Sequence, residues 1–120
     1  HLAWAGGVGP AVAAVRAQAP WPCRLMVEAE TAGEAEAAVR AGADGVLLDE
    51  FSPEALAALV PRLRAQAVER GAPVVLEASG VRPEALRSYA ATGIDLISTR
   101  APVTRSAWLD LSMRFEPVLA

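Results

Sequence analysis

The chain has 120 residues, carries a formal net charge of −3 and is 53% hydrophobic. This length suits one domain with a buried core, and the acidic balance argues against non-specific nucleic-acid binding. No apolar stretch approaches the ~20 residues of a membrane span, and the start does not resemble a signal peptide.

The single cysteine, Cys23, excludes an internal disulfide and a cysteine-based metal site, and fits a reducing cytoplasm. We expect it to be a small buried apolar residue. All 11 basic residues are arginines, so a Schiff-base lysine or a P-loop lysine is impossible within this chain. Anionic ligands would have to be bound by arginine or by backbone N–H groups.

Helices and strands are expected to alternate along the chain. The expected helices lie at about 10–18, 31–40, 53–70 and 84–90, and the expected strands at 24–30, 45–49, 74–79 and 94–98. Residues 109–115 alternate apolar and polar side chains, which predicts a last strand or a short helix. A glycine run at 6–9 precedes the first helix, but a dinucleotide loop must follow a strand, so nucleotide binding is not expected there.

Local signals support these helix boundaries. Thr31 and Glu34 form a capping-box pattern, and Ser52 before Pro53 predicts an N-cap followed by a first-turn proline. Pro61 lies inside the third helix and should kink or split it. The third helix should bury the face formed by Leu56, Leu59, Val60, Leu63 and Ala67.

Alternating strands and helices predict a parallel sheet with right-handed crossovers. All strand carboxyl ends then lie at one edge, where Glu30, Asp49, Glu77, Ser79 and the loop 98–105 should meet. About four strands cannot close an eight-stranded barrel. We therefore predict an α/β fold that forms part of a TIM-like barrel, completed by another segment or subunit.

The stretch 74–80 is an apolar run that ends in Glu77, Ser79 and Gly80, ahead of a predicted helix. Glycine permits close approach of a ligand, and a helix N-terminus favours an anion, so we predict a phosphate-binding loop. An ordinary turn is the alternative. The acids at the strand ends could bind sugar hydroxyls or a divalent ion, or act as general acid and base. They could also simply cap helices. Glu28 is included among them because it lies two residues before Glu30 and so shares its strand face. The three tryptophans are expected to pack in the interior.

The chain resembles the C-terminal part of the quinolinate phosphoribosyltransferase family (nicotinate-nucleotide pyrophosphorylase, carboxylating). The resemblance rests on six pieces in the family's order: His1 with 5–9, Val27–Glu30, 41–49, Leu76–Gly80, Tyr89–Asp95, and 104–106 with 109–112. It implies an incomplete barrel-like domain over 1–120, with a separate N-terminal domain and the first barrel strands absent from this chain.

The implied reaction converts quinolinate and phosphoribosyl pyrophosphate to nicotinate mononucleotide, pyrophosphate and carbon dioxide in NAD synthesis, with Mg²⁺. By the same resemblance, Glu30 and Asp49 would contact the ribose. Ser79, Gly80 and Val81 would form the loop at the sugar phosphate, and the turn from Arg100 would form a second phosphate contact. The family's catalytic lysine precedes the position of His1, so no catalytic residue is expected here, and the chain alone is expected to be inactive.

Three positions depart from the family pattern. Glu50 replaces an asparagine, Val81 replaces a glycine or asparagine, and the turn 100–106 is one residue longer with Arg105 in place of a histidine. Arg105 could replace that histidine as a phosphate donor.

Two other functions compete with this one. The first is a molybdenum-utilisation relative of the same fold, and the second is a non-catalytic half-barrel that serves as a scaffold or dimerisation piece. The free edges of a partial barrel also predict a homodimer or higher homo-oligomer.

Overall fold

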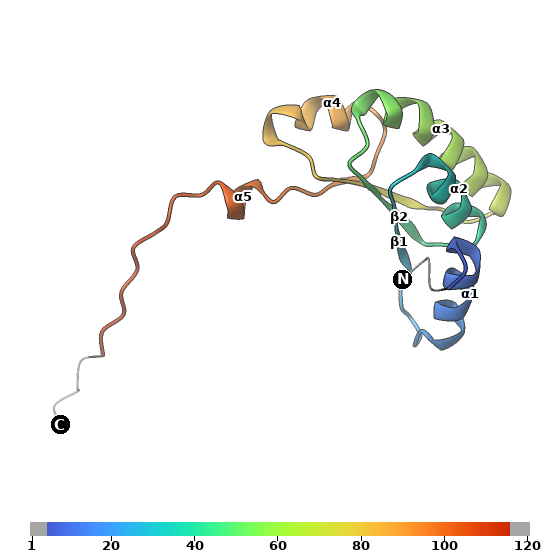
Figure 1. The fold of residues 1–120 in the computed structure, drawn as a ribbon, viewed down its shortest axis with the longest axis horizontal. Helices are drawn as coiled ribbons and strands as arrows, with labels where there is room; N and C mark the ends of the chain where they lie inside the picture. Colours follow the sequence, from blue (N-terminus) through green and yellow to red (C-terminus); the bar gives the residue numbers. More distant parts are fainter. Residues whose placement is uncertain (1–4, 116–120) are drawn as a thin grey trace.

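The structure, a computed structural model, describes residues 5–115 and contains one four-stranded parallel sheet (Figure 1). The strands follow one another in the sheet in chain order, β1-β2-β3-β4. Their bounds are Met26–Ala29 (β1), Gly45–Asp49 (β2), Val75–Ser79 (β3) and Leu96–Ile97 (β4). The sheet is open within the described residues, so the predicted α/β fold with a partial barrel sheet is confirmed.

Helices α1 to α4 lie on one face of the sheet, and α5 lies in the segment that leaves it (Figure 1). Their bounds are Val8–Gln18 (α1), Ala32–Arg40 (α2), Pro53–Arg70 (α3), Pro83–Ala85 (the 3₁₀ turn η1), Leu86–Ala90 (α4) and Ala101–Thr104 (α5). Each parallel pair of strands is joined by a crossover that contains at least one helix, as a parallel ladder requires.

The predicted helix signals are present as hydrogen bonds. The Thr31 hydroxyl accepts the Glu34 N–H at 3.2 Å, and the Glu34 carboxylate accepts the Thr31 N–H at 3.1 Å, so the capping box of α2 is complete. Ser52 caps α3 by accepting the Ala55 N–H at 3.2 Å. Gly71 ends α3 with φ +74°, a left-handed conformation that glycine adopts without a steric penalty.

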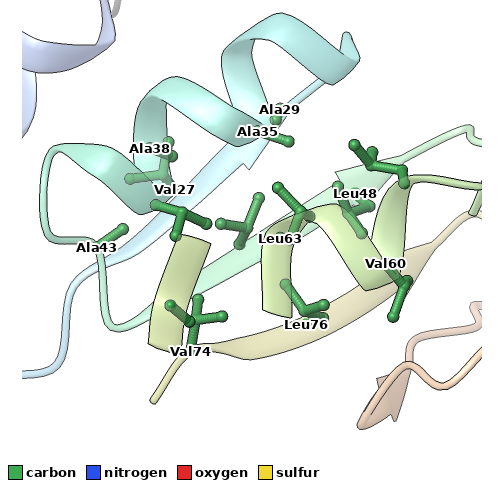
Figure 2. Packing of buried hydrophobic residues seen from close by; sticks show 14 of the residues in the cluster. Val27, Ala29, Ala35, Ala38, Ala43, Leu48, Val60, Leu63, Val74 and Leu76 are labelled. Carbon is green, nitrogen blue, oxygen red and sulfur yellow. The ribbon is translucent and has the colours of Figure 1, made fainter. Parts of the chain in front are cut away.

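The core lies between the sheet and the helices (Figure 2). Leu48 and Leu76 point from the strands toward the helices and are fully buried, and Leu63 reaches them from α3. The predicted apolar face of α3 is confirmed, since all five of its members are buried: Leu56, Leu59, Val60, Leu63 and Ala67.

Pro61 does not split α3, so that part of the prediction was wrong. The proline is exposed, on the side of the helix away from the core. The carbonyl of Ala57, which loses its helical partner, also belongs to an exposed residue and can bond to water. Burial of Leu59, Val60 and Leu63 on either side keeps the helix continuous.

Three expected elements differ in length or type. The helix expected at 84–90 is divided into η1 and α4, and β4 has only two residues. Although short, β4 stays in register with β3 through the pairs Glu77↔Leu96 and Ala78↔Ile97. The segment 106–115 forms neither a strand nor a helix and extends away from the sheet (Figure 1).

Two expectations about burial were wrong. Cys23 is exposed, because it lies in the loop between α1 and β1 rather than on a core-facing position. Trp21 and Trp108 are also exposed and do not pack in the core, while Trp4 and His1 lie outside the described residues. Within residues 5–115, no helix has both the length and the apolar character needed to cross a membrane.

Candidate functional site at the carboxyl edge of the sheet

The described helices leave one face of the sheet uncovered. Burial alternates along β1 and β3, so that Val27, Ala29, Leu76 and Ala78 face the helices while the side chains between them do not. Met26 and Val75, at the start of β1 and β3 on the uncovered face, remain 44% and 40% exposed. Polar residues on this face are therefore accessible to a ligand.

Acids and a hydroxyl meet where this face reaches the carboxyl edge, the edge at which the strands end. Asp49 lies directly beside Ser79 in the β2–β3 register. Glu30 follows β1 one residue after Ala29, which is paired with Leu48, so Glu30 comes at the level of Asp49. Glu30 is exposed, while Asp49 and Ser79 are half-buried. The strand register therefore brings Glu30, Asp49 and Ser79 to the same edge, as predicted.

Glu77 lies one layer deeper on the same face and is half-buried. Its carboxylate accepts a hydrogen bond from the Ser98 hydroxyl, which follows β4. The contact fixes the Ser98 end of the fourth strand against β3, so Glu77 is not a helix cap. Glu28 is at the same level on β1, paired in register with Leu47, and is exposed.

The loop after β3 offers an anion fewer groups than the sequence predicted. Gly80 has φ +73° and is exposed, which leaves its backbone approachable. The Val81 side chain is only 3% exposed and packs in the core, so this residue can offer a ligand only its backbone. The helix expected behind the loop begins as the three-residue turn η1 with Pro83 in its first turn, so backbone N–H groups, not a helix dipole, are the available donors.

The turn 100–105 is linked by an ion pair to η1, which follows this loop. Arg100 precedes the single-turn helix α5, and both Arg100 and Arg105 are exposed. The Arg105 guanidinium donates to the Glu84 carboxylate at 3.1 Å, which joins the turn to η1. The pKa of Glu84 is lowered, first by a hydrogen bond from its own backbone and also by Arg105. This ion pair is the link between the two expected phosphate-contacting segments.

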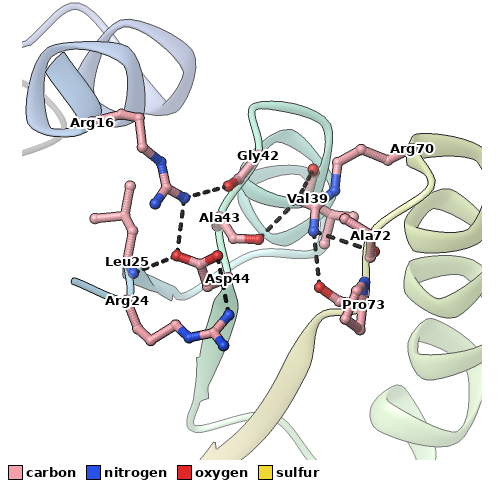
Figure 3. Close-up of polar contacts among 10 residues, drawn as sticks. All are labelled: Arg16, Arg24, Leu25, Val39, Gly42, Ala43, Asp44, Arg70, Ala72 and Pro73. Atoms are coloured by element: carbon pink, nitrogen blue, oxygen red, sulfur yellow. Dashed lines mark hydrogen bonds and ion pairs between the residues drawn. The ribbon is translucent and has the colours of Figure 1, made fainter. Parts of the chain in front are cut away.

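At the opposite, amino edge of the sheet, where the strands begin, charged side chains bind other parts of the chain (Figure 3). Asp44, just before β2, accepts the Leu25 N–H at 2.7 Å and the Arg16 guanidinium at 3.0 Å. Arg24 lies 3.8 Å from the other carboxylate oxygen. The backbone hydrogen bond from Leu25 is the largest cause that lowers the pKa of Asp44, and Arg16 and Arg24 add to it. Asp44 therefore joins α1, β1 and β2.

Asp95 repeats this arrangement before β4. It accepts the Leu76 N–H at 2.7 Å and the Arg64 guanidinium at 2.8 Å. Burial acts to raise the pKa of Asp95, but the Leu76 hydrogen bond and Arg64 together outweigh it and lower that pKa. The similarity between 41–49 and 92–98, both with a glycine and an aspartate before a strand, thus has a structural cause.

Arginine also binds backbone carbonyls at this edge. Arg70 donates to the carbonyls of Val39 and Ala43, each at 2.8 Å, and to that of Pro73 at 3.0 Å (Figure 3). Arg64 donates to the Val74 carbonyl at 2.7 Å. A guanidinium can serve several acceptors from one planar group, which a lysine ammonium does less well, so the arginine-only composition suits this role.

Glu50 is a feature of the carboxyl edge whose geometry the sequence did not predict. It directly follows Asp49 and has φ +56°, and its Cγ is 3.8 Å from the point where a Cβ on Gly80 would lie. The departure from the family's asparagine was a signal, because asparagine tolerates this left-handed conformation better than glutamate does. Among residues 5–115, no group of three or more His, Cys, Asp or Glu residues could hold a metal ion.

Comparison with known proteins agrees with this geometry. The family model described as "Quinolinate phosphoribosyl transferase, C-terminal domain" matches residues 1–114. A probable nicotinate-nucleotide pyrophosphorylase [carboxylating] of Synechocystis sp. is 35% identical over 116 residues, covering 95% of this chain and 38% of the relative. The Homo sapiens nicotinate-nucleotide pyrophosphorylase [carboxylating] is 37% identical over 115 residues, covering 95% and 37%.

Solved structures give the same result. A NadC deletion mutant in a cubic space group matches with TM-score 0.78 and 28% identity, over 96% of this chain and 38% of that one. The nicotinate-nucleotide pyrophosphorylase from Francisella tularensis matches with TM-score 0.69 and 32% identity, over 84% and 34%. The chain thus spans about two-fifths of the length of the curated relatives named here.

Proposed function

The chain belongs to the quinolinate phosphoribosyl transferase C-terminal domain family, and on this premise we propose that it forms the ribose-phosphate side of a phosphoribosyltransferase site. The full protein would convert quinolinate and phosphoribosyl pyrophosphate to nicotinate mononucleotide, pyrophosphate and carbon dioxide. The relatives named as nicotinate-nucleotide pyrophosphorylases support this reaction class.

One observation supports the proposal above the others: Asp49 and Ser79 are adjacent in register at the carboxyl edge, on the face that the described helices leave uncovered. Parallel α/β folds bind their ligands at this edge. The amino edge, by contrast, has its best-placed charged groups, Asp44, Asp95 and Arg70, already bonded to the chain's own backbone.

Each candidate residue has a distinct role in the proposal. Carboxylates accept hydrogen bonds from vicinal hydroxyls, so Glu30 and Asp49 would bind and orient the ribose. Ser79 and the backbone N–H groups at Gly80 and Val81 would bind the sugar phosphate, with the small glycine allowing close approach. Arg100 and Arg105 would contribute positive charge from the neighbouring turn.

This arrangement would stabilise a ribosyl cation as pyrophosphate leaves. Negative charge from Glu30 and Asp49 on the hydroxyl side of the ring would favour the developing positive charge at the sugar. The ribose would be held at two ends, by its hydroxyls and by its phosphate, which fixes the reacting carbon in position. Quinolinate would be bound by residues other than those assigned here.

Mg²⁺ would enter the site together with the substrate phosphoribosyl pyrophosphate. Mg²⁺ is usually held by one or two carboxylates plus substrate phosphates rather than by a dedicated protein cage. When bound, the ion would offset the charge of the leaving pyrophosphate.

We also propose a homodimer or higher homo-oligomer in the cytoplasm. The strands β1 and β4 lie at the two ends of the sheet, and an uncovered edge with exposed apolar residues favours association. Cys23 is a free, exposed thiol, which fits a reducing compartment.

The test is a product assay with the full-length protein, quinolinate, phosphoribosyl pyrophosphate and Mg²⁺. Formation of nicotinate mononucleotide, dependent on all three, is the expected result. Pyrophosphate release that ignores quinolinate, or no turnover by a folded protein, would contradict the assignment. The 120 residues alone are expected to give no turnover, because the relatives use a chain more than twice as long.

A further inference from the structure

Glu50 has an unusual backbone conformation at the proposed phosphate loop. Among residues 5–115 it is the one non-glycine residue with positive φ, at +56°. A glutamate in this region is strained relative to glycine or asparagine. Strain of this kind persists where the surrounding structure imposes it, and it concentrates at functional sites.

The neighbours of Glu50 hold it in place from both sides. Asp49 before it is paired with Ser79 in the sheet. Phe51 after it has its carbonyl bound by the Tyr89 hydroxyl of α4 at 2.8 Å, in a half-buried contact. Ser52 then begins α3 as its N-cap. The Glu50 backbone therefore has little freedom to leave the left-handed conformation.

The side chain of Glu50 lies near Gly80. A Cβ built on Gly80 would be 3.8 Å from the Glu50 Cγ, so the Glu50 side chain borders the open side of this glycine. The carboxylate is attached to that Cγ, so a negative charge lies at the edge of the loop proposed to bind the sugar phosphate. Glu50 is exposed, so its side chain is reachable from solvent and by a ligand.

We propose that Glu50 sets the affinity of the Gly80 loop for phosphate monoesters by repelling them. This inference rests on the proposed function of that loop. The substrate phosphoribosyl pyrophosphate and the nucleotide product carry the same sugar phosphate, so a weaker hold at the loop also speeds release of the product. Glu50 is thus a specificity-determining residue that opposes the loop's attraction for highly charged ligands.

The experiment measures the dissociation constant of phosphoribosyl pyrophosphate with Mg²⁺ by calorimetry on the full-length protein. Glu50→Gln removes the charge and keeps the shape, and Glu50→Asn is a second neutral variant suited to positive φ. Glu69→Gln is the matched control, because Glu69 is an exposed acid at the far end of α3. At low ionic strength, both Glu50 variants should bind about three- to tenfold tighter than the wild type, and the control should not change.

Raising the salt concentration should shrink this difference, because exposed charges are screened. Equal or weaker binding by both folded Glu50 variants would overturn the inference and leave the proposed function standing. No binding by the wild type or by any variant would instead remove the proposed phosphate loop itself, and the inference with it.

Discussion

Replacing Asp44 with alanine should destabilise the fold without touching the proposed site. The Asp44 carboxylate accepts the Leu25 N–H at 2.7 Å and the Arg16 guanidinium at 3.0 Å. Its side chain is 26% exposed, so the Leu25 N–H would lose its partner in a half-buried position. The change removes a link between α1, β1 and β2 at the amino edge.

The expected cost follows from these two contacts. A hydrogen bond from a backbone N–H to a charged acceptor contributes about 1.5–3 kcal/mol, and a partly exposed ion pair adds about 0–1 kcal/mol. Asp44→Ala should therefore lower the free energy of unfolding by about 2–3 kcal/mol, or roughly 8–15 °C in Tm for a domain of this size. Asp44→Asn keeps an acceptor oxygen and should lose only about 1 kcal/mol.

Urea unfolding followed by circular dichroism measures both variants, with Asp110→Asn as a control for the loss of one exposed carboxylate. The order expected is alanine below asparagine, and asparagine below wild type, with the control unchanged. An alanine variant within 0.5 kcal/mol of the wild type, or two variants of equal stability, would refute the reasoning.

Three further predictions concern the fold. The pKa of Asp44 is lowered in the folded state, so the stability that its carboxylate contributes is complete above about pH 5 and is lost as pH falls through 3.8 and below. Unfolding curves at several pH values should therefore show the difference in stability between wild type and Asp44→Asn shrinking as the pH is lowered. A difference that widens in acid would contradict this. Leu63→Ala should cost about 2–5 kcal/mol in urea unfolding because Leu63 is fully buried, whereas Val68→Ala, at an 80% exposed position of the same helix, should change stability by less than ~0.5 kcal/mol; equal losses would be inconsistent with the core described. Glu50→Gly should raise the free energy of unfolding by about 0.5–1 kcal/mol, and the thermal midpoint with it, because φ +56° suits glycine. A lower midpoint would argue against a strained backbone at this position.

Much of the fold could be predicted because the local signals are strong and agree with one another. The capping box at Thr31, the Ser52-Pro53 start and the Gly71 end each specify a helix boundary through their own hydrogen bonds or dihedral angles. The apolar spacing of α3 specified its buried face. Alternation of strands and helices then specified the parallel order and the shared carboxyl edge.

What could not be predicted depends on contacts distant in sequence. Pro61 did not split α3, because burial of its neighbours outweighed the loss of one hydrogen bond. Cys23 is exposed because its loop runs along the surface, which composition does not report. Asp44 and Asp95 each follow a glycine and precede a strand, but the residues whose N–H groups they accept, Leu25 and Leu76, lie 19 residues away and had no signal of their own.

The sequence predicted which strand ends form the candidate site, but it did not predict which side chains of the loops are exposed there. The register confirms that Asp49 and Ser79 are adjacent. Val81 was expected in the loop, yet its side chain is in the core, because an apolar residue after a strand end can turn inward. The Glu84–Arg105 ion pair joins residues 21 positions apart, and Glu50 lies near Gly80, 30 positions along the chain, so only the fold brings these residues together.

The most direct test compares the two aspartates at opposite ends of β2. Asp49→Asn and Asp44→Asn make the same chemical change, one at the carboxyl edge and one at the amino edge. If the carboxyl edge binds the ribose, Asp49→Asn should weaken binding of phosphoribosyl pyrophosphate with Mg²⁺ by about 10–100-fold in calorimetry and leave the unfolding midpoint unchanged. Asp44→Asn should lower the midpoint and leave the binding of the folded protein unchanged; unaltered binding by a folded Asp49→Asn protein would contradict the proposed site.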